Sequence, residues 1–194
     1  MVMAEGILEG RRLVLRPLAE ADAAELGSAV ADSREALRKR LGWAAPDPAP
    51  GDAAAFIAAV RAAAEARTAL SWGVFEAKGG ALAGVASLDE LQPAERGHAR
   101  LALWVRTGRT DRGYATEAGR LVVEHAFKTL ALRRLSARLD PVNRAFRRVL
   151  KRLGFRYEGC LRADKRLNNR WIDQECWGML RSDRAPAKPT TRKK

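Results

Sequence analysis

Hydrophobic positions repeat along this chain with two different periods, and these periods indicate its secondary structure. Apolar residues that alternate with other residues, as Leu135, Ala137 and Leu139 do, predict β-strands. Apolar residues three or four positions apart, such as Val122 and Ala126, predict helices that bury one face. The predicted strands span residues 12–16, 70–77, 81–88, 97–105, 135–139, 156–160 and 171–180. The predicted helices span residues 20–31, 34–41, 52–67, 116–130 and 143–153.

Turn and capping residues separate these elements. Ser33 is expected to cap the second helix, and Gly154 is expected to close the last one in a left-handed conformation. Lys78-Gly79-Gly80 suits a tight hairpin turn, and the proline-containing segment 44–51 predicts a loop. Because strands and helices are interleaved and no repeat is present, the pattern predicts a mixed α/β or α+β sheet in one domain.

The composition supports one globular domain. The chain has 194 residues, of which 47% are hydrophobic and 30% charged. No apolar run approaches the roughly 20 residues needed to cross a bilayer, and residues 1–10 lack the features of a secretory signal. Two cysteines, Cys160 and Cys176, predict neither a disulfide framework nor a metal site, and they favour a reducing cytoplasm.

The net charge of +13 is concentrated in the last third of the chain. Residues 1–132 hold 17 basic and 17 acidic residues, whereas residues 133–194 hold 19 basic and 6 acidic residues. Such a field favours an anionic partner: a phosphorylated cofactor, an acidic substrate or nucleic acid. Residues 184–194 are expected to form a basic, disordered tail after a domain of residues 1–183.

The segment Trp104–Glu117, WVRTGRTDRGYATE, is the most informative for chemistry. A strand runs into a loop containing Gly108 and Gly113 and then into a helix, whose first amides have no intrahelical partners. This arrangement suits a pyrophosphate, because the helix dipole is positive there and glycine allows close approach. An ordinary strand-to-helix turn with solvated arginines is the alternative. The arginines of this loop are Arg106, Arg109 and Arg112.

The segment 112–118, RGYATEA, resembles the acetyl-coenzyme A loop of the GNAT acetyltransferase superfamily, and in particular its Rim-type branch of ribosomal-protein N-terminal acetyltransferases. Further similar blocks follow in the family's order at residues 13–18, 33–43, 84–88, 140–145, 148–150, 153–155, 158–162 and 168–173. The resemblance implies a single GNAT-like domain, with a mixed, mostly antiparallel sheet flanked by helices. It also implies a V-shaped split between two central parallel strands.

The resemblance implies acetyl-coenzyme A as cosubstrate and no metal. The pantetheine arm would enter between the strands 101–105 and 135–139, and an amide near Val105 would polarise the thioester carbonyl. Asn143 would bind pantetheine or orient the acetyl end, its alternative role being that of a helix N-cap. The implied cofactor-binding residues are Leu103, Trp104, Val105, Arg106, Arg109, Thr110, Asp111, Arg112, Gly113, Tyr114, Ala115, Thr116, Asn143, Phe146 and Arg148.

The helix over 143–153 carries five cations on one face, which are Arg144, Arg147, Arg148, Lys151 and Arg152. Such a stripe is commonly a solvated surface, but five like charges repel one another and favour an anion nearby. The 3′-phosphate of the coenzyme is one candidate anion, and acidic ribosomal protein or RNA is the other.

Acetyl transfer requires a neutral amine, and the resemblance implies Glu158 as its general base. The alternative is a surface glutamate on a strand that pairs with one of the many arginines. An α-amino group with a pKa near 8 needs only mild help, because about a tenth of it is neutral at pH 7. The resemblance places Trp43 and Trp72 where they would line the acceptor pocket, and the alternative for each tryptophan is a position in the core or at its rim. The chain departs from the family where Phe146 replaces a serine, Arg100 replaces a glutamate, and Thr110 replaces a glutamine or arginine.

These observations favour an acetyl-coenzyme A-dependent N-acetyltransferase that acts on a primary amine, with a protein or peptide N-terminus as the leading acceptor. A small amine, such as a polyamine, an amino acid or an antibiotic, is a second possibility. A catalytically weak relative that binds RNA or the ribosome is a third, because of the basic last third and the missing serine. We expect a cytoplasmic monomer or homodimer with no membrane partner.

Overall fold

The computed structural model describes residues 6–40, 52–92, 97–167 and 169–184. Trp43, the predicted loop over 44–51 and residues 185–194 of the predicted tail therefore lie outside the described residues. Within the described part, no helix is long and apolar enough to cross a membrane.

Eight strands form one sheet in the order β1-β2-β3-β4-β5-β6-β8-β7. The strands are β1 (Leu8–Glu9), β2 (Leu13–Arg16), β3 (Leu70–Glu76), β4 (Leu82–Gln92), β5 (His98–Val105), β6 (Arg134–Leu139), β7 (Arg156–Leu167) and β8 (Arg170–Leu180). The helices are α1 (Ala23–Arg40), α2 (Asp52–Glu65), α3 (Tyr114–Lys128) and α4 (Arg144–Leu153), with short 3-10 turns at Glu20–Asp22 and Arg181–Arg184.

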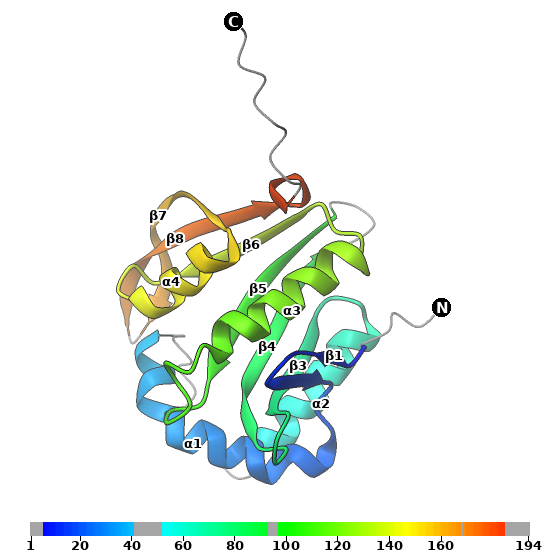
Figure 1. Cartoon of the computed structure of the whole chain (residues 1–194). Helices are drawn as coiled ribbons and strands as arrows, with labels where there is room; N and C mark the ends of the chain where they lie inside the picture. Colours follow the sequence, from blue (N-terminus) through cyan, green and yellow to red (C-terminus); the bar gives the residue numbers. More distant parts are fainter. Residues whose placement is uncertain (1–5, 41–51, 93–96, 168, 185–194) are drawn as a thin grey trace, which may run out of the picture.

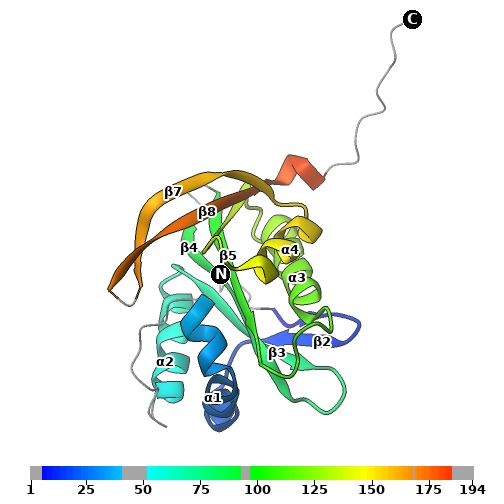
Figure 2. The ribbon, with the colours of Figure 1, turned by 90° about the vertical axis from the view of Figure 1, so that its left-hand side faces the viewer.

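Helices cover both faces of the sheet. Figures 1 and 2 show α3 and α4 on one face and α1 and α2 on the other. The core accordingly has two layers: Leu13, Trp72 and Val122 belong to the layer beneath α3, and Leu26 and Ile57 belong to the layer beneath α1 and α2. Strand β3 is buried on both faces from its first residue to the sixth, as expected for a central strand covered on both sides.

The predicted split between two parallel strands is present between β5 and β6. These strands pair only at His98↔Arg134, Ala99↔Leu135 and Arg100↔Ser136, although β5 continues to Val105 and β6 to Leu139. Every other strand pair is antiparallel. The unpaired edges therefore face each other across a gap that opens toward the carboxyl ends of both strands, which confirms the predicted architecture.

The N-terminal helices differ from the prediction. The two helices expected over 20–31 and 34–41 are one continuous helix, α1, and Ser33 lies inside it. Ser33 is buried, and its hydroxyl accepts a hydrogen bond from the amide of Thr107 at 2.9 Å. The serine therefore fixes α1 to the loop after β5. The two-residue strand β1 was not predicted from the sequence.

Candidate active site

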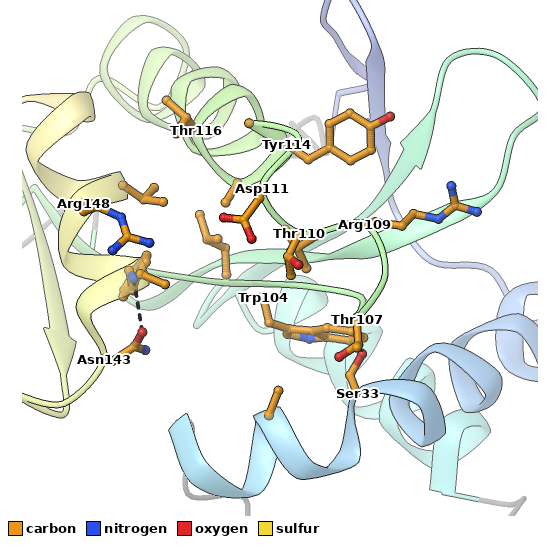
Figure 3. Close-up of a pocket in the computed structure, with 18 of the residues that line it drawn as sticks. Ser33, Trp104, Thr107, Arg109, Thr110, Asp111, Tyr114, Thr116, Asn143 and Arg148 are labelled. Atoms are coloured by element: carbon orange, nitrogen blue, oxygen red, sulfur yellow. Dashed lines mark hydrogen bonds between the residues drawn. The ribbon is translucent and has the colours of Figure 1, made fainter.

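A cleft of about 490 Å³ lies at the open end of the split. Its lining comes from α1, the end of β5, the loop that follows, and the first turns of α3 and α4 (Figure 3). Most of the predicted cofactor-binding residues meet here. They are Leu103, Trp104, Val105, Arg109, Thr110, Asp111, Gly113, Tyr114, Ala115, Thr116, Asn143, Phe146 and Arg148.

The start of α3 presents free backbone amides to this cleft. Gly113 caps the helix in a left-handed conformation with φ 79°, and the first intrahelical bond runs from the amide of Glu117 to the carbonyl of Gly113. Helix geometry leaves the amides of Tyr114, Ala115 and Thr116 without intrahelical acceptors. Because the positive end of the helix dipole lies at the same place, the turn suits a pyrophosphate.

Strand β2 holds this turn in place. The backbone amide and Nε of Arg12 each donate to the Glu117 carboxylate at 2.8 Å, and Nη1 of Arg12 donates to the carbonyl of Arg112 at 2.7 Å. Burial acts to raise the pKa of Glu117, but the two hydrogen bonds and the charge from Arg12 outweigh it and lower that pKa. The Glu117 carboxylate thus remains charged and anchors the first turn of α3.

All three loop arginines lie near protein carboxylates. Arg106 and Arg109 are hydrogen-bonded to them, and Arg112, which does not line the cleft, has its Nη1 3.9 Å from Glu76. Nη1 of Arg109 donates to Oε2 of Glu76 at 2.5 Å, and the Arg109 side chain extends away from the Trp104 side of the cleft (Figure 3). Arg106 pairs with Asp32 on α1 and is absent from the residues that line the cleft. The described loop can therefore hold an anion mainly through its backbone amides.

The free edge of β5 offers further backbone donors. The amide of Arg106 donates to the carbonyl of Ala83 on β4 at 2.7 Å. Since successive amides of a strand point in opposite directions, the amides of Val105 and Leu103 point to the other edge, into the split. Gly84 permits the close pairing of β4 and β5 here, because a Cβ at this position would lie 2.1 Å from the carbonyl oxygen of Trp104.

Helix α4 forms the opposite wall. Asn143 is buried, and its Oδ1 accepts a hydrogen bond from the amide of Phe146 at 3.1 Å, so it is the N-cap of the helix (Figure 3). Its amide NH₂ group remains available to the cleft that it lines. The basic stripe on α4 has two parts. Arg148 and Arg152 line the cleft, whereas Arg147 donates to both carboxylate oxygens of Glu175, at 3.0 and 2.5 Å.

A second pocket of about 540 Å³ lies on the α2 side of the sheet and meets the first. The residues common to both pockets are Leu103, Trp104, Asn143 and Phe146. The second pocket also has an apolar wall from α2, which includes Phe56 and Val60. The split is thus approached from two sides, with Phe146 at the junction.

Most polar residues of the second pocket come from six strands, and the sequence did not predict that they meet. The strand residues are Ser71, Ser87, Asp89, Arg100, Arg138, Lys165 and Gln174, while Asp140 directly follows β6 and Asn143 caps α4. Of these residues, only Arg100 is distinctive in the sequence, because it replaces a glutamate that is common in the family. No local spacing marks the set, because the residues are brought together by the sheet alone.

Trp72 does not fit its predicted role in the acceptor pocket. Its side chain is fully buried beneath α3, its ring lies 5.5 Å from that of His125, and its Nε1 donates to the carbonyl of Gly6 at 3.2 Å. It lines neither pocket. The prediction was wrong because both faces of β3 are buried and Trp72 lies on the face opposite the second pocket, which Ser71 lines.

Glu158 also lies elsewhere than predicted. Its carboxylate makes two hydrogen bonds with the guanidinium of Arg134, at 2.7 and 2.5 Å, near the closed end of the split. Glu158 lines neither pocket. The hydrogen bond from Arg134 lowers the Glu158 pKa, with the charge of Arg134 adding to the effect against partial burial, so the carboxylate is a weaker base than usual. The position does not support the predicted role as general base.

Neither cysteine lines either pocket. Cys160 is exposed, Cys176 is half-buried, and neither forms a disulfide. Among the described residues, no three His, Cys, Asp or Glu side chains are grouped so that they could hold a metal ion.

Comparisons with known proteins place this geometry in a family. The family model for the acetyltransferase (GNAT) domain matches residues 12–156. The probable N-acetyltransferase YjcK of Bacillus subtilis is 33% identical over 112 residues, which are 58% of this chain and 62% of that protein. The chain therefore matches less than two thirds of that relative's length.

Solved structures share the fold. RimJ of Mycobacterium smegmatis, in complex with CoA disulfide, has a TM-score of 0.84 and 24% identity, with 90% of this chain and 84% of that chain covered. RimL, a ribosomal L7/L12 α-N-protein acetyltransferase in complex with coenzyme A, has a TM-score of 0.84 and 19% identity, with 90% and 98% covered. Since the family model matches well over half of the chain, and the split sheet agrees with it, this chain belongs to the GNAT acetyltransferase family.

Proposed function

We propose that this protein transfers the acetyl group of acetyl-coenzyme A to the N-terminal α-amine of a protein or peptide. The observation that supports this most strongly is the meeting of two pockets at the open end of the split. The donor would enter from the cleft beside α3. The acceptor would enter from the second pocket, beside α2, which we therefore call the acceptor pocket. The two would meet at Asn143 and Phe146. RimJ and RimL, which share the fold, were solved with forms of coenzyme A.

The cleft residues fit acetyl-coenzyme A by chemistry. The amides of Tyr114, Ala115 and Thr116 suit the pyrophosphate, and the amides of Leu103 and Val105 suit the carbonyl groups of the pantetheine arm and thioester. Arg148 and Arg152 supply positive charge for the remaining phosphate. These proposed contacts are largely made by backbone, which explains how Thr110 can replace the usual family residue.

The reaction forms one bond and breaks another. The neutral amine attacks the thioester carbon, the N–C bond forms, and the C–S bond breaks to release coenzyme A thiolate. The Val105 amide would stabilise the developing oxyanion, and Asp89 or Asp140 in the acceptor pocket could take up the amine proton through water. Phe146 cannot protonate the thiolate, so solvent would do so, which is chemically reasonable for a thiol of pKa near 8.5.

The acceptor is proposed to be a peptide because an α-amine is the easiest amine to use here. About a tenth of an α-amine with pKa near 8 is neutral at pH 7, against less than a thousandth of a lysine side chain. The name of RimL also describes an α-N-protein acetyltransferase. We further propose that the protein acts in the cytoplasm, where the thiols of Cys160 and Cys176 would stay reduced.

A thiol-release assay tests the function. Acetyl-coenzyme A is incubated with the protein and a panel of N-terminal peptides, free amino acids and polyamines, and products are identified by mass. We expect release of coenzyme A with peptides, an added mass of one acetyl group at the α-amine, and no product from the same peptides with a blocked N-terminus. Release of coenzyme A with small amines but not with peptides would replace the peptide proposal. If no amine of the panel causes release, acetyl transfer is contradicted.

A further inference from the structure

The acceptor pocket contains two arginines with distant carboxylate partners. Nη2 of Arg100 lies 3.7 Å from Asp89 and 3.3 Å from Glu90, and Nη1 of Arg138 lies 3.4 Å from Asp164. These separations are longer than the 2.7–2.9 Å of a good charge-assisted hydrogen bond. Arg138 therefore makes one long hydrogen bond to a carboxylate, and the Arg100 guanidinium is close to two carboxylates without a hydrogen bond to either.

Arginines with structural roles in the same molecule are different. Arg147 bonds both oxygens of Glu175 at 3.0 and 2.5 Å, and Arg134 bonds both oxygens of Glu158 at 2.7 and 2.5 Å. Both of those carboxylates have lowered pKa values: the hydrogen bond from Arg134 acts on Glu158, and Arg147 and Trp177 together overcome burial at Glu175. Outside the acceptor pocket, therefore, the fold provides these two guanidinium groups with well-placed carboxylate acceptors.

Arg100 also has an unsatisfied donor. Its Nε is buried and has no hydrogen-bond partner among the described residues. A buried donor without a partner destabilises a structure, and such atoms in native proteins commonly have a ligand or water as partner. Trp104 Nε1, at the junction of the two pockets, is buried without a described partner as well.

A third cation, Lys165, lines the same pocket. Burial lowers its pKa, the charge of Arg100 lowers it further, and Asp140 partly offsets both effects. An added anion would relieve this repulsion. Asp89 and Asp140 line the pocket too, so it offers carboxylates for an ammonium group and cations for an acid group.

We infer that the acceptor carries a carboxylate close to its reacting amine, and that Arg100 and Arg138 bind this carboxylate. Guanidinium groups bind carboxylates through two parallel hydrogen bonds. A bound carboxylate would therefore provide acceptors for guanidinium donors that the protein does not satisfy here. The carboxylate could be an acidic side chain next to a peptide N-terminus or the α-carboxylate of a free amino acid. This inference rests on the proposed acetyl transfer.

Matched acceptors test the inference. We compare peptides that begin Ala-Asp with peptides that begin Ala-Asn and are otherwise identical, and free amino acids with their amides. Each kcat/KM is expressed per neutral amine, because removing a nearby carboxylate charge lowers the pKa of the α-amine. The expected kcat/KM is about tenfold higher for the carboxylate member of at least one pair, mainly through a lower KM. The peptide pair and the amino-acid pair distinguish the two sources of the carboxylate. Equal kcat/KM within both pairs overturns the inference while leaving acetyl transfer intact.

Charge-removing variants link the preference to the pocket. Arg100→Gln, and separately Arg138→Gln, should reduce the preference to about threefold or less. Arg156→Gln removes the same charge on β7 from a residue that pairs with Asp183 and does not line the pocket, so it should keep the preference. The increase in Tm with acetyl-coenzyme A reports whether each variant is folded. A full preference in both folded pocket variants would also overturn the inference.

Discussion

The carboxylate of Glu76 binds Nη1 of Arg109 at 2.5 Å and accepts a hydrogen bond from the hydroxyl of Tyr114 at 2.8 Å. Nη1 of Arg112 lies 3.9 Å from the same carboxylate. A single acidic residue on β3 thus offsets the charge of two arginines beside the proposed phosphate loop. The loop is consequently less positive than its sequence suggests.

This relationship predicts an unusual gain from removing a charge. Glu76→Gln should tighten coenzyme A binding about two- to fivefold at low salt, because Arg109 and Arg112 are no longer neutralised, while glutamine can still accept the Tyr114 hydrogen bond. The gain should shrink at high salt. Calorimetric titration at two ionic strengths measures it. Glu124→Gln, on the exposed side of α3 beside Lys128, is the matched control and should leave the affinity unchanged.

Gly84 should be essential for the donor site. Alanine at this position would place its Cβ against the Trp104 carbonyl and displace the end of β5, whose amides are proposed to bind the pantetheine arm. We expect Gly84→Ala to weaken the binding of acetyl-coenzyme A by more than about tenfold, which is equivalent to about 1.4 kcal/mol of binding free energy. Gly79→Ala is the control, because Gly79 also has positive φ, but a Cβ there meets nothing within 4 Å. An equal loss of affinity in both variants would contradict the specific role of Gly84.

Glu158 should not govern the pH dependence of catalysis. Glu158→Gln breaks an ion pair with Arg134 outside both pockets, and we expect kcat/KM to change by less than about threefold at pH 7 and at pH 9. Rate profiles from pH 6 to pH 10 for wild type and variant measure this. A large loss at pH 7 that diminishes at pH 9 would restore Glu158 as the general base.

Glu117 should make stability depend on pH. Its pKa is lowered in the folded protein, so its contribution is present above the ordinary glutamate pKa and is lost as pH falls through the folded-state value. Glu117→Gln should therefore reduce the free energy of unfolding by about 1–2 kcal/mol at pH 7 and by progressively less below pH 4.5. Urea unfolding at several pH values measures the difference. A difference that grows on acidification would contradict the assignment.

Local signals in the sequence predicted most of the framework. The alternation in β6 and the capping residues Asn143 and Gly154 correctly located a strand and both ends of a helix, because these features depend on neighbouring residues. The capping signal of Ser33 was misleading. Its hydroxyl accepts a hydrogen bond from the amide of Thr107, a tertiary contact that the local sequence does not specify, and α1 continues past Ser33.

The residues that line the cleft beside α3 were mostly predicted, both in the loop after β5 and at the start of α4. The loop that ends at Gly113 is continuous in the sequence, so its chemistry could be predicted from the residues together. Trp72 and Glu158 were misplaced because the sequence does not show which face of a doubly covered strand meets which pocket, or how far along the sheet a side chain lies. A shift in register between Tyr157 and Gly159 adds to the difficulty for Glu158. The second pocket is lined by residues from six strands, which only the folded sheet brings together.

Backbone amides in the split and at the start of α3 are proposed to hold the donor, and hydrogen–deuterium exchange measures those amides directly. With coenzyme A added, exchange should slow in segments that contain Leu103 to Val105 and Gly113 to Glu117, and it should be unchanged in the β7–β8 hairpin. Binding of coenzyme A without slower exchange in either of the first two segments would show that these amides do not hold the donor.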